Sequence, residues 1–204
     1  STSEIDQLVY ASKVASLAHE LAMRHSRKGI TEYQLQGIIE GFFAYAGTAG
    51  WSYPSIVGCG ENATILHYKT NNDTCGDDEV ILIDAGAEYR GYASDITRSW
   101  PISGTFSDAQ KEIYEVVLDA QLAGIAACQV GNPYTAPHEA ARRVMAEGLI
   151  RLGVISQTVE EALDLETGEL KRWFMHNTSH WIGLDVHDVG VYKPSGEPRL
   201  LEPG

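Results

Sequence analysis

Apolar residues at helical spacing predict two helices at the start of the chain. The first carries apolar residues three or four positions apart, which places them on one face, and it ends at Gly29. This face comprises Tyr10, Val14, Leu17 and Leu21. Thr31 and Gln34 form a capping box at the start of the second helix, which Gly47 ends. Its apolar stripe comprises Leu35, Ile38, Ile39, Phe42 and Ala46.

Between about residues 51 and 102 the helical spacing gives way to short apolar runs. Proline and glycine residues separate these runs, and β-branched residues are frequent within them. Such a pattern predicts strands. The predicted strands are Ser55–Val57, Thr64–Tyr68, Val80–Ile83 and Tyr92–Trp100.

A second pair of helices follows the strand region. Ser107 and Gln110 form another capping box, and Thr135 with Pro137 opens a further helix that ends at Gly153. The stripe of the earlier helix comprises Ile113, Val116, Val117, Ala120 and Gly124. The stripe of the later helix comprises Ala141, Val144, Met145 and Leu152.

The two helix pairs indicate a weak internal repeat. Residues 29–31 (Gly-Ile-Thr) and 131–133 (Gly-Asn-Pro) occupy matching places before the second helix of each pair. The acidic segment 154–172 has no clear pattern, and we expect a short helical turn and a surface loop there. If the repeat extends through both halves, the second half should also end in strands, which have barely begun by Gly204.

Composition and charge exclude two classes of function. Hydrophobic residues occupy 44% of the 204 positions, which is ordinary for a globular protein with a core. The net charge is −13, from 28 acidic and 15 basic residues, without the Lys/Arg cluster that nucleic acid requires. No stretch approaches the roughly 18 apolar residues of a membrane span, and the acidic N-terminus differs from a signal peptide.

The three cysteines point to a reducing environment. Cys59, Cys75 and Cys128 form no CxxC pair, and their number is odd. We expect each to be a small buried or incidental residue rather than a metal ligand or a nucleophile. A cytoplasmic location fits this pattern best.

Two aspartates are predicted to lie close together on a hairpin. Residues 80–98 read as a strand, a tight turn and a second strand. If the turn centres between Tyr89 and Arg90, Asp84 lies directly opposite Asp95, with Cβ atoms about 4.5–5.5 Å apart. At about 5 Å and an effective dielectric constant near 20, the two charges repel by roughly 3 kcal/mol. Protonation of one acid, a nearby arginine or a bridging divalent metal would relieve that repulsion.

Histidines concentrate in one segment near the end of the sequence. His176, His180 and His187 lie within twelve residues of a chain that holds seven histidines, which favours a metal or catalytic site. His176 and His180 have the spacing of a helical zinc pair, but Gly183 and its β-branched neighbours predict a loop and a strand. Histidines on predicted helices are interpreted as structural: His19, His25 and His138. His67, at the end of a strand-like run, is a weaker candidate.

Four segments together resemble bacterial Xaa-Pro aminopeptidases. They are ILHY, LIDAGAEYRGYASDITRSWP, FMHNTSHWIGLDVHDVG and RLLEPG, in the order of that family. The resemblance implies the α+β pita-bread fold, with two pseudo-symmetric halves of helix pair plus strands. Residues 1–204 would form the metallopeptidase catalytic domain, with a first half of about 1–103 and an incomplete second half of about 104–204. The N-terminal domain usual in the family would be absent.

The resemblance also implies a two-metal site. By it, Asp84 is a ligand of one metal ion, Asp95 bridges both ions and His180 binds the second. Manganese is the usual metal of the family, and a carboxylate-rich donor set with one imidazole suits manganese better than a thiolate-seeking metal. Two ions about 3.5–4 Å apart activate a bridging water and stabilise the tetrahedral intermediate.

Three further histidines take substrate-side roles by the same resemblance. His67 and His187 would hold the scissile peptide and its developing oxyanion, and His176 would lie close by. Asn177 replaces a glycine of the family pattern, a change that asparagine tolerates if the backbone is left-handed. The two glutamate ligands of the family lie downstream of RLLEPG, and Glu202 matches an earlier, non-ligand copy of that motif. The 204-residue chain alone is therefore expected to be inactive.

The expected activity is hydrolysis of the N-terminal Xaa-Pro peptide bond by a metal-bridging hydroxide. The expected partners are peptides with proline in second position, with a homo-oligomer in the full-length protein. A Xaa-Pro dipeptidase (prolidase) is the alternative enzyme, whereas methionine aminopeptidase resembles the histidine segment less. The alternative of another class is a non-catalytic, peptide-binding member of the fold, or an inactive fragment.

Overall fold

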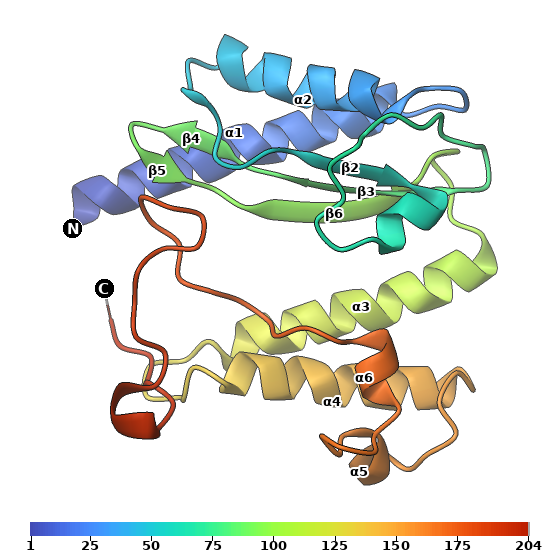
Figure 1. Ribbon diagram of the computed structural model, residues 1–204, viewed down its shortest axis with the longest axis vertical. Helices are drawn as coiled ribbons and strands as arrows, with labels where there is room; N and C mark the ends of the chain where they lie inside the picture. Colours follow the sequence, from blue (N-terminus) through green and yellow to red (C-terminus); the bar gives the residue numbers. More distant parts are fainter. Residues whose placement is uncertain (204) are drawn as a thin grey trace. The chain divides into compact units, whose positions relative to one another are not determined.

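The structure is a computed structural model that describes residues 1–203 (Figure 1). The chain divides into two compact units. Unit 1 comprises Ser1–Phe106 and Trp181–Val189, and unit 2 comprises Ser107–His180 and the described residues after Val189. The predicted division into two halves stays a prediction, and its last residue, Gly204, lies outside the described range.

Two helices form one layer of unit 1. They are α1 (Thr2–His25) and α2 (Glu32–Tyr45). The predicted capping box of α2 is present, since the Thr31 backbone N–H donates to Gln34 Oε1 at 3.0 Å. The predicted face of α1 was wrong in part, because Tyr10 and Leu17 are exposed. The buried face of α1 is instead made mainly of small residues: Ala11, Val14, Ala15, Ala18 and Ala22.

An antiparallel sheet forms the other layer of unit 1. Its strands are β2 (Ile56–Cys59), β3 (Val80–Ala85) and β6 (Ile96–Pro101), in the order β2-β3-β6. A second small sheet contains β1 (Gly50–Trp51), β4 (Ala87–Tyr89) and β5 (Tyr92–Ala93). Figure 1 shows α1 and α2 on the same side of the larger sheet. Residues that pack between these helices and the sheet include Leu35, Ile39, Phe43, Val57, Ile81 and Ile83.

The predicted strand Thr64–Tyr68 is absent, so that prediction was wrong. The chain forms the 3₁₀ helix η1 (Gly60–Thr64) and then a turn, in which the Tyr68 N–H donates to the Ile65 carbonyl at 3.2 Å. His67 has a φ of 54°, in the left-handed region. A strand cannot contain this backbone conformation, which explains why the apolar run misled.

Unit 2 is built on two helices, α3 (Asp108–Ala127) and α4 (Ala136–Arg151), which lie side by side (Figure 1). Gly148 allows close approach, because a Cβ atom there would lie 2.4 Å from Val116 Cγ1. The shorter elements are α5 (Val159–Ala162), α6 (Leu170–Trp173) and η2 (Pro194–Gly196). A small core contains Ala146, Leu149, Ile155, Ala162 and Leu170.

The predicted stripes of α3 and α4 were right only in part. Ser107 caps α3 as predicted, and Val116, Ala120 and Gly124 are buried. Ile113 and Val117, also assigned to that stripe, are exposed. On α4 the buried residues are Pro137, Ala141, Ala146, Gly148 and Leu149, so small residues again replace part of the expected face.

Each unit contains the same backbone hydrogen-bond pattern, which we call the clamp. In unit 1, the Gly29 N–H donates to the Cys75 carbonyl at 2.9 Å, and the Cys75 N–H donates to the Ile30 carbonyl at 2.8 Å. In unit 2, the Gly131 N–H donates to the Leu201 carbonyl and the Leu201 N–H to the Asn132 carbonyl, both at 2.8 Å.

A third hydrogen bond extends both clamps by one step. It joins the Glu32 N–H to the Asp73 carbonyl at 2.9 Å in unit 1, and the Tyr134 N–H to the Arg199 carbonyl at 2.7 Å in unit 2. The glycine that starts each clamp, Gly29 or Gly131, has a positive φ. The weak repeat in the sequence thus corresponds to a shared local structure.

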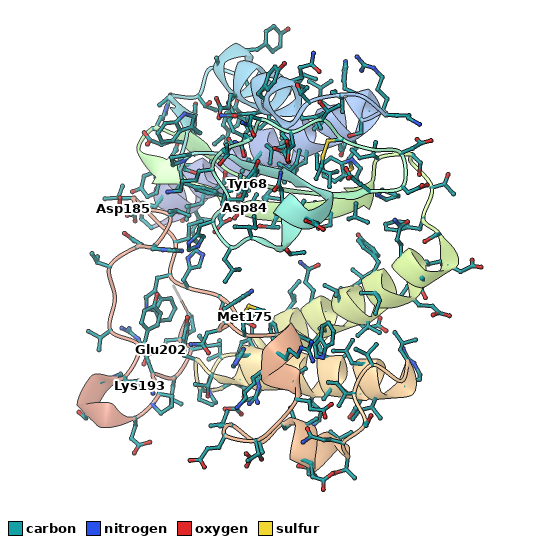
Figure 2. The ribbon with its side chains drawn as sticks, turned by 45° about the vertical axis from the view of Figure 1, so that its right-hand side comes forward. Tyr68, Asp84, Met175, Asp185, Lys193 and Glu202 are labelled. Carbon is teal, nitrogen blue, oxygen red and sulfur yellow. A yellow bond between two sulfur atoms is a disulfide. The ribbon has the colours of Figure 1, made fainter. Side chains whose placement is uncertain are left out.

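The cysteines depart from the expectation. Cys59 and Cys75 are buried, as expected, but they are joined by a disulfide with Cα atoms 5.5 Å apart (Figure 2). Cys128 lies outside this bond and is exposed. The disulfide contradicts the expected reducing environment, so the cysteines do not support the cytoplasmic location, which stays a prediction. Among the described residues, no helix is both long and apolar enough to cross a membrane.

Candidate metal centre

The hairpin that carries the two aspartates has a different register from the predicted one. Asp84, on β3, lies opposite Thr97 on β6. Asp95 directly precedes β6, so it is a diagonal neighbour of Asp84 and not its direct partner. Because the offset is two residues, both aspartates still point to the same face of the sheet.

The turn explains the altered register. Tyr89 pairs with Tyr92, so the turn consists of Arg90 and Gly91 and not of residues 89 and 90. Arg90 and Gly91 have φ values of 52° and 84°. A two-residue hairpin turn with two positive φ values matches the twist of the strands, and glycine enters this region at little cost.

A tyrosine that the sequence analysis missed joins the two aspartates. The Tyr53 hydroxyl donates to Asp95 Oδ1 at 2.8 Å and forms a short hydrogen bond with Asp84 Oδ1. A hydroxyl has one proton, so it serves the two carboxylates as alternatives or shares the proton between them. Nothing in the local sequence marks Tyr53, because the contact depends on long-range folding. Since one hydroxyl contacts both carboxylates, the structure confirms that Asp84 and Asp95 converge.

A glycine allows the two sides of the aspartate hairpin to approach closely near Asp95. A Cβ atom on Gly86 would lie 1.7 Å from the Ser94 carbonyl oxygen, which lies next to Asp95 in the chain. The Ser52 hydroxyl donates to the same carbonyl at 2.7 Å. The backbone near the carboxylates is thus held by close packing and by hydrogen bonds.

Burial changes the proton affinities of these groups. Burial raises the pKa of Asp84, the Tyr53 hydrogen bond lowers it, and the negative charge of Asp95 raises it. The pKa of Tyr53 is raised by burial first and by both carboxylates next. Two partly buried carboxylates with one hydroxyl between them form an oxygen-rich donor set that favours a cation.

Of the predicted histidines, His67 and His187 belong to unit 1. His67 is exposed and lies one residue before the buried Tyr68. His187 is also exposed, on a segment that the Ala93 N–H holds by donating to the Gly183 carbonyl at 2.8 Å. This bond attaches the histidine segment to β5, two residues before Asp95.

His176 and His180 belong to unit 2 and do not lie on a helix. The Tyr134 hydroxyl donates to the Ser179 carbonyl at 2.6 Å. Ser179 has a φ of 67°, whereas Asn177 is not in the left-handed region, so Asn177 needs no special tolerance. The predicted loop is confirmed and the helical zinc pair is absent, but the strand predicted around Gly183 was wrong, because residues 174–190 form no strand.

The three helix histidines are mostly structural, as interpreted. His19 is buried, and its ring nitrogens contact the Ala15 and Ile83 carbonyls at 2.9 and 3.4 Å. His25 contacts the Leu21 carbonyl. His138, however, contacts Thr178 Oγ1 at 3.1 Å, so it supports the segment that carries His176 and His180.

Within residues 1–203, no group of three or more His, Cys, Asp or Glu side chains converges as a metal site. Asp84 and Asp95 lie in unit 1, and His180 lies in unit 2. Glu202, labelled in Figure 2, is exposed and its carboxylate lies 3.8 Å from Arg199 Nη2. The assignments of these residues as metal ligands stay predictions, with the aspartate pair the part that the structure brings together.

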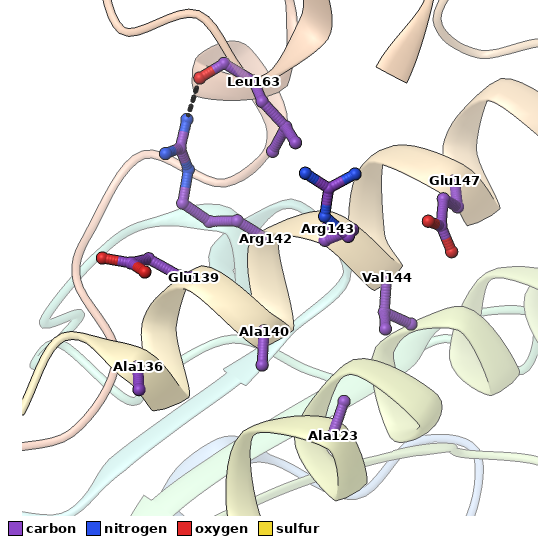
Figure 3. A pocket seen from close by; sticks show the side chains of 9 residues that line it. All are labelled: Ala123, Ala136, Glu139, Ala140, Arg142, Arg143, Val144, Glu147 and Leu163. Atoms are coloured by element: carbon purple, nitrogen blue, oxygen red, sulfur yellow. Dashed lines mark hydrogen bonds between the residues drawn. The ribbon is translucent and has the colours of Figure 1, made fainter. Parts of the chain in front are cut away.

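A pocket of about 610 Å³ lies in unit 2, and none of the predicted site residues lines it (Figure 3). Its lining residues are Ala123, Ala136, Glu139, Ala140, Arg142, Arg143, Val144, Glu147 and Leu163. The arginines have local partners, since Arg142 donates to the Leu163 carbonyl at 2.7 Å and Arg143 pairs with Glu160 at 3.0 Å. The pocket contains no convergent group that would do chemistry.

Comparison with known proteins identifies the class of the protein. The model of metallopeptidase family M24 matches residues 6–204. The chain therefore belongs to metallopeptidase family M24, and it has the pita-bread fold of aminopeptidase P. A zinc-substituted Escherichia coli aminopeptidase P in complex with product is similar to it with a TM-score of 0.90 and 41% identity, over 100% of this chain and 46% of that one.

Two named relatives show how similar the chain is to individual members of the family. The Xaa-Pro aminopeptidase of Escherichia coli K12 is 42% identical over 204 residues, which are 100% of this chain and 46% of that protein. The Xaa-Pro dipeptidase of Rattus norvegicus is 36% identical over 206 residues, covering 98% of this chain and 41% of the relative. The chain thus spans less than half the length of these relatives.

Proposed function

We propose that this chain is the part of a Xaa-Pro aminopeptidase that contributes the aspartate pair and the site histidines. The main support is that Asp84 and Asp95 converge on the hydroxyl of Tyr53 in a chain that is 42% identical to such an aminopeptidase. Paired carboxylates at the end of a buried strand are costly unless a cation joins them. A non-catalytic member of the fold would have no use for them.

The donor set fits divalent metal ions. Asp84 and Asp95 would hold them, and His180 would supply the imidazole ligand. Hard carboxylate oxygens with one imidazole favour manganese, which we propose as the metal of a two-ion site. When bound, the ions would polarise the scissile carbonyl and lower the pKa of a water molecule. Tyr53 orients both carboxylates, which keeps their oxygens on one side.

The remaining histidines are proposed to act on the peptide substrate. His67 and His187 would donate hydrogen bonds to the carbonyl oxygen of the scissile bond as negative charge develops there. Both are exposed, so a peptide can reach them. His176 would lie near the substrate and support this arrangement. The substrates proposed are peptides with proline in the second position, and the proposed compartment is the cytoplasm.

The test is hydrolysis of Xaa-Pro-Xaa tripeptides by the full-length protein, that is, the chain with whatever adjoins it in its reading frame. Manganese should restore activity after removal of metal by a chelator, and the variant Asp84→Asn should remain inactive. A full-length protein that binds no divalent metal and cleaves no proline-containing peptide would contradict the proposal and favour a peptide-binding role.

Xaa-Pro dipeptidase activity is the second candidate. It is favoured by the 36% identity to the rat enzyme of that name. Kinetics on a Xaa-Pro dipeptide and on a Xaa-Pro-Xaa tripeptide separate the two activities. An aminopeptidase cleaves the tripeptide, whereas a strict dipeptidase cleaves only the dipeptide.

A further inference from the structure

Unit 1 contains a fully buried carboxylate that the proposed mechanism does not use. Glu32, at the start of α2, has an exposed fraction of 0%. Its Oε1 accepts hydrogen bonds from the Cys59 N–H at 2.8 Å and from Asn62 Nδ2 at 3.0 Å. Its Oε2 accepts from the Tyr68 hydroxyl at 2.8 Å and from the Asp73 N–H at 3.0 Å. A buried charge persists only with such compensation.

The four donors belong to one loop and to both of its ends. Cys59 ends β2, Asn62 lies in η1, Tyr68 is in the middle, and Asp73 is part of the clamp. One carboxylate therefore gathers a loop of 15 residues, Cys59–Asp73, from both sides. The disulfide between Cys59 and Cys75 closes the same loop covalently.

The loop carries His67 in a backbone conformation that requires support. A histidine with a φ of 54° is uncommon, and such residues persist where the surroundings determine the conformation. The next residue, Tyr68, is buried and donates its hydroxyl to Glu32, while His67 itself is exposed. Anchoring Tyr68 inside the unit thus turns the imidazole of His67 outward.

We propose that Glu32 is a positioning residue that fixes His67 for its contact with the substrate, through the hydroxyl of Tyr68. The inference rests on the substrate-side role proposed for His67. Glu32 is too deeply buried to touch a substrate. An amide would serve poorly in its place, because four donors converge on its two oxygens and a glutamine offers one acceptor oxygen and a competing NH₂ group.

Unit 2 contains a counterpart that supports this reading. Tyr134 occupies the place in the second clamp that Glu32 occupies in the first. Its hydroxyl donates to the carbonyl of Ser179, which has a φ of 67° and directly precedes His180. In both units, the residue that donates the third hydrogen bond of the clamp also contacts a loop through its side chain. In each loop a residue with a positive φ is a candidate site histidine, as at His67, or directly precedes one, as at Ser179.

The test uses Tyr68→Phe in the full-length protein with manganese, and Tyr45→Phe as the matched control. Tyr68→Phe removes only the hydroxyl, which donates to Glu32 and accepts from Asn62 Nδ2, so the unit should fold and bind metal. We expect kcat on a Xaa-Pro-Xaa peptide to fall roughly tenfold with KM changed less than about twofold, because small misplacements of a catalytic group reduce the rate steeply. Tyr45 is 88% exposed, so Tyr45→Phe should leave both constants unchanged.

A double-mutant cycle separates positioning from general damage. If Tyr68 acts through His67, the double variant Tyr68→Phe/His67→Ala should have the kcat of His67→Ala alone. A further tenfold loss in the double variant would overturn the inference, and so would a Tyr68→Phe variant with the kcat of the unaltered protein. An active His67→Ala variant would instead refute the proposed role of His67, so the two failures are distinguishable.

The variant Glu32→Gln is an independent test of the same inference, provided that circular dichroism shows it to be folded. It should lower kcat at least as much as Tyr68→Phe, again with metal content and KM retained. The effect should likewise disappear in the His67→Ala background. A Glu32→Gln protein that folds, binds manganese and turns over normally would overturn the inference.

Discussion

The two units begin alike and then differ in how they support their candidate site residues. Both have a helix pair and the clamp, with glycine at a positive φ at its start. In unit 1 the clamp leads into the sheet β2-β3-β6, and the aspartates lie on that sheet or directly beside it. In unit 2, His176 and His180 lie on a segment without regular structure, which Tyr134 contacts at Ser179 and His138 contacts at Thr178.

The difference shows which part of the candidate site is held in place by regular structure. A strand ladder fixes side-chain direction for Asp84, and Tyr53 fixes its carboxylate together with that of Asp95. Rigid support of this kind favours precise ligand geometry. The segment of unit 2 that carries His176 and His180 belongs to no strand ladder, so we expect it to be the more mobile part. The following predictions test that contrast, from the largest expected effect to the smallest.

Asp95→Asn in the full-length protein should abolish turnover and remove at least one metal ion. Substituting a group that only orients a ligand typically costs about 10–100-fold in affinity or activity, and a ligand itself should cost more. Metal content and hydrolysis of a Xaa-Pro-Xaa peptide are measured together. Asp77→Asn, at an exposed turn, is the matched control. Two bound metals with near-normal turnover in Asp95→Asn would show that Asp95 is no ligand.

His187→Ala should lower kcat by about two to three orders of magnitude, as loss of an oxyanion donor does. Metal content should stay intact, since His187 is placed on the substrate side. His25→Ala, which changes another exposed histidine of unit 1, should leave kcat unchanged. If His187→Ala strips metal, His187 is itself a ligand, and the roles of His180 and His187 must be exchanged.

Cys59→Ser should reduce the free energy of unfolding of unit 1 by about 3 kcal/mol, because the disulfide closes a loop with a sequence separation of 16 residues. Urea denaturation measures the loss.

Hydrogen exchange adds a direct comparison of the two clamps. The amides of Gly29 and Cys75 should exchange more slowly than those of Gly131 and Leu201, and this advantage should shrink in Cys59→Ser. Equal exchange in the two clamps would break the contrast between the units.

Tyr53→Phe should weaken metal binding by about 10–100-fold, the range for groups that orient ligands. Added manganese should recover most of the activity, since the carboxylates remain. Titration of the metal-free protein with manganese measures the affinity, with Tyr45→Phe as control. An unchanged affinity would mean that the strand ladder alone orients the aspartates.

The free energy of unfolding of unit 1 should fall in mild acid, because protonation of His19 favours the unfolded chain. Burial lowers the pKa of His19 below its ordinary value, and the charge of Arg98 lowers it further, while the backbone contacts and the charge of Asp84 oppose this shift only in part. The unfolded chain binds a proton near pH 6.5 that the folded unit binds only at lower pH, so stability falls as pH drops below about 6.5. Urea denaturation at a series of pH values between 7 and 5 measures this loss of stability.

The control for this pH effect uses both units. His19→Gln should flatten the dependence of the unfolding free energy on pH, whereas His25→Gln should not. His138 in unit 2 also has a lowered pKa, from burial first and Arg142 next, but it is less buried. His138→Gln should therefore flatten the dependence less than His19→Gln. An opposite order would contradict the assignment.

Local signals in the sequence predicted the helices and the central strands well. The capping boxes at Thr31 and Ser107 are present because they need only residues three apart. The predicted helix faces were less accurate, since large apolar side chains such as Leu17 mark a possible face while alanines form the one that packs. Small side chains permit close approach to the sheet, and periodicity does not reveal this.

Long-range contacts explain the other differences. The approach of the two aspartates was predicted, but their register was displaced, because the choice between neighbouring turn positions depends on positive φ at Arg90 and Gly91. The run Thr64–Tyr68 has strand composition, yet the buried Glu32 and the clamp bend it into a turn. The contacts of Tyr53 and Glu32 join residues far apart in the sequence, and no local pattern announces them.

The disulfide has a consequence for proteolysis. Lys69 is exposed and lies between Cys59 and Cys75, so trypsin that cuts after it opens a loop whose ends remain covalently joined. The nicked protein would migrate as one band on a non-reducing gel and as two fragments after reduction. Nicking would also interrupt the chain two residues after His67. The disulfide would keep the two fragments together, but the imidazole would lose its set orientation.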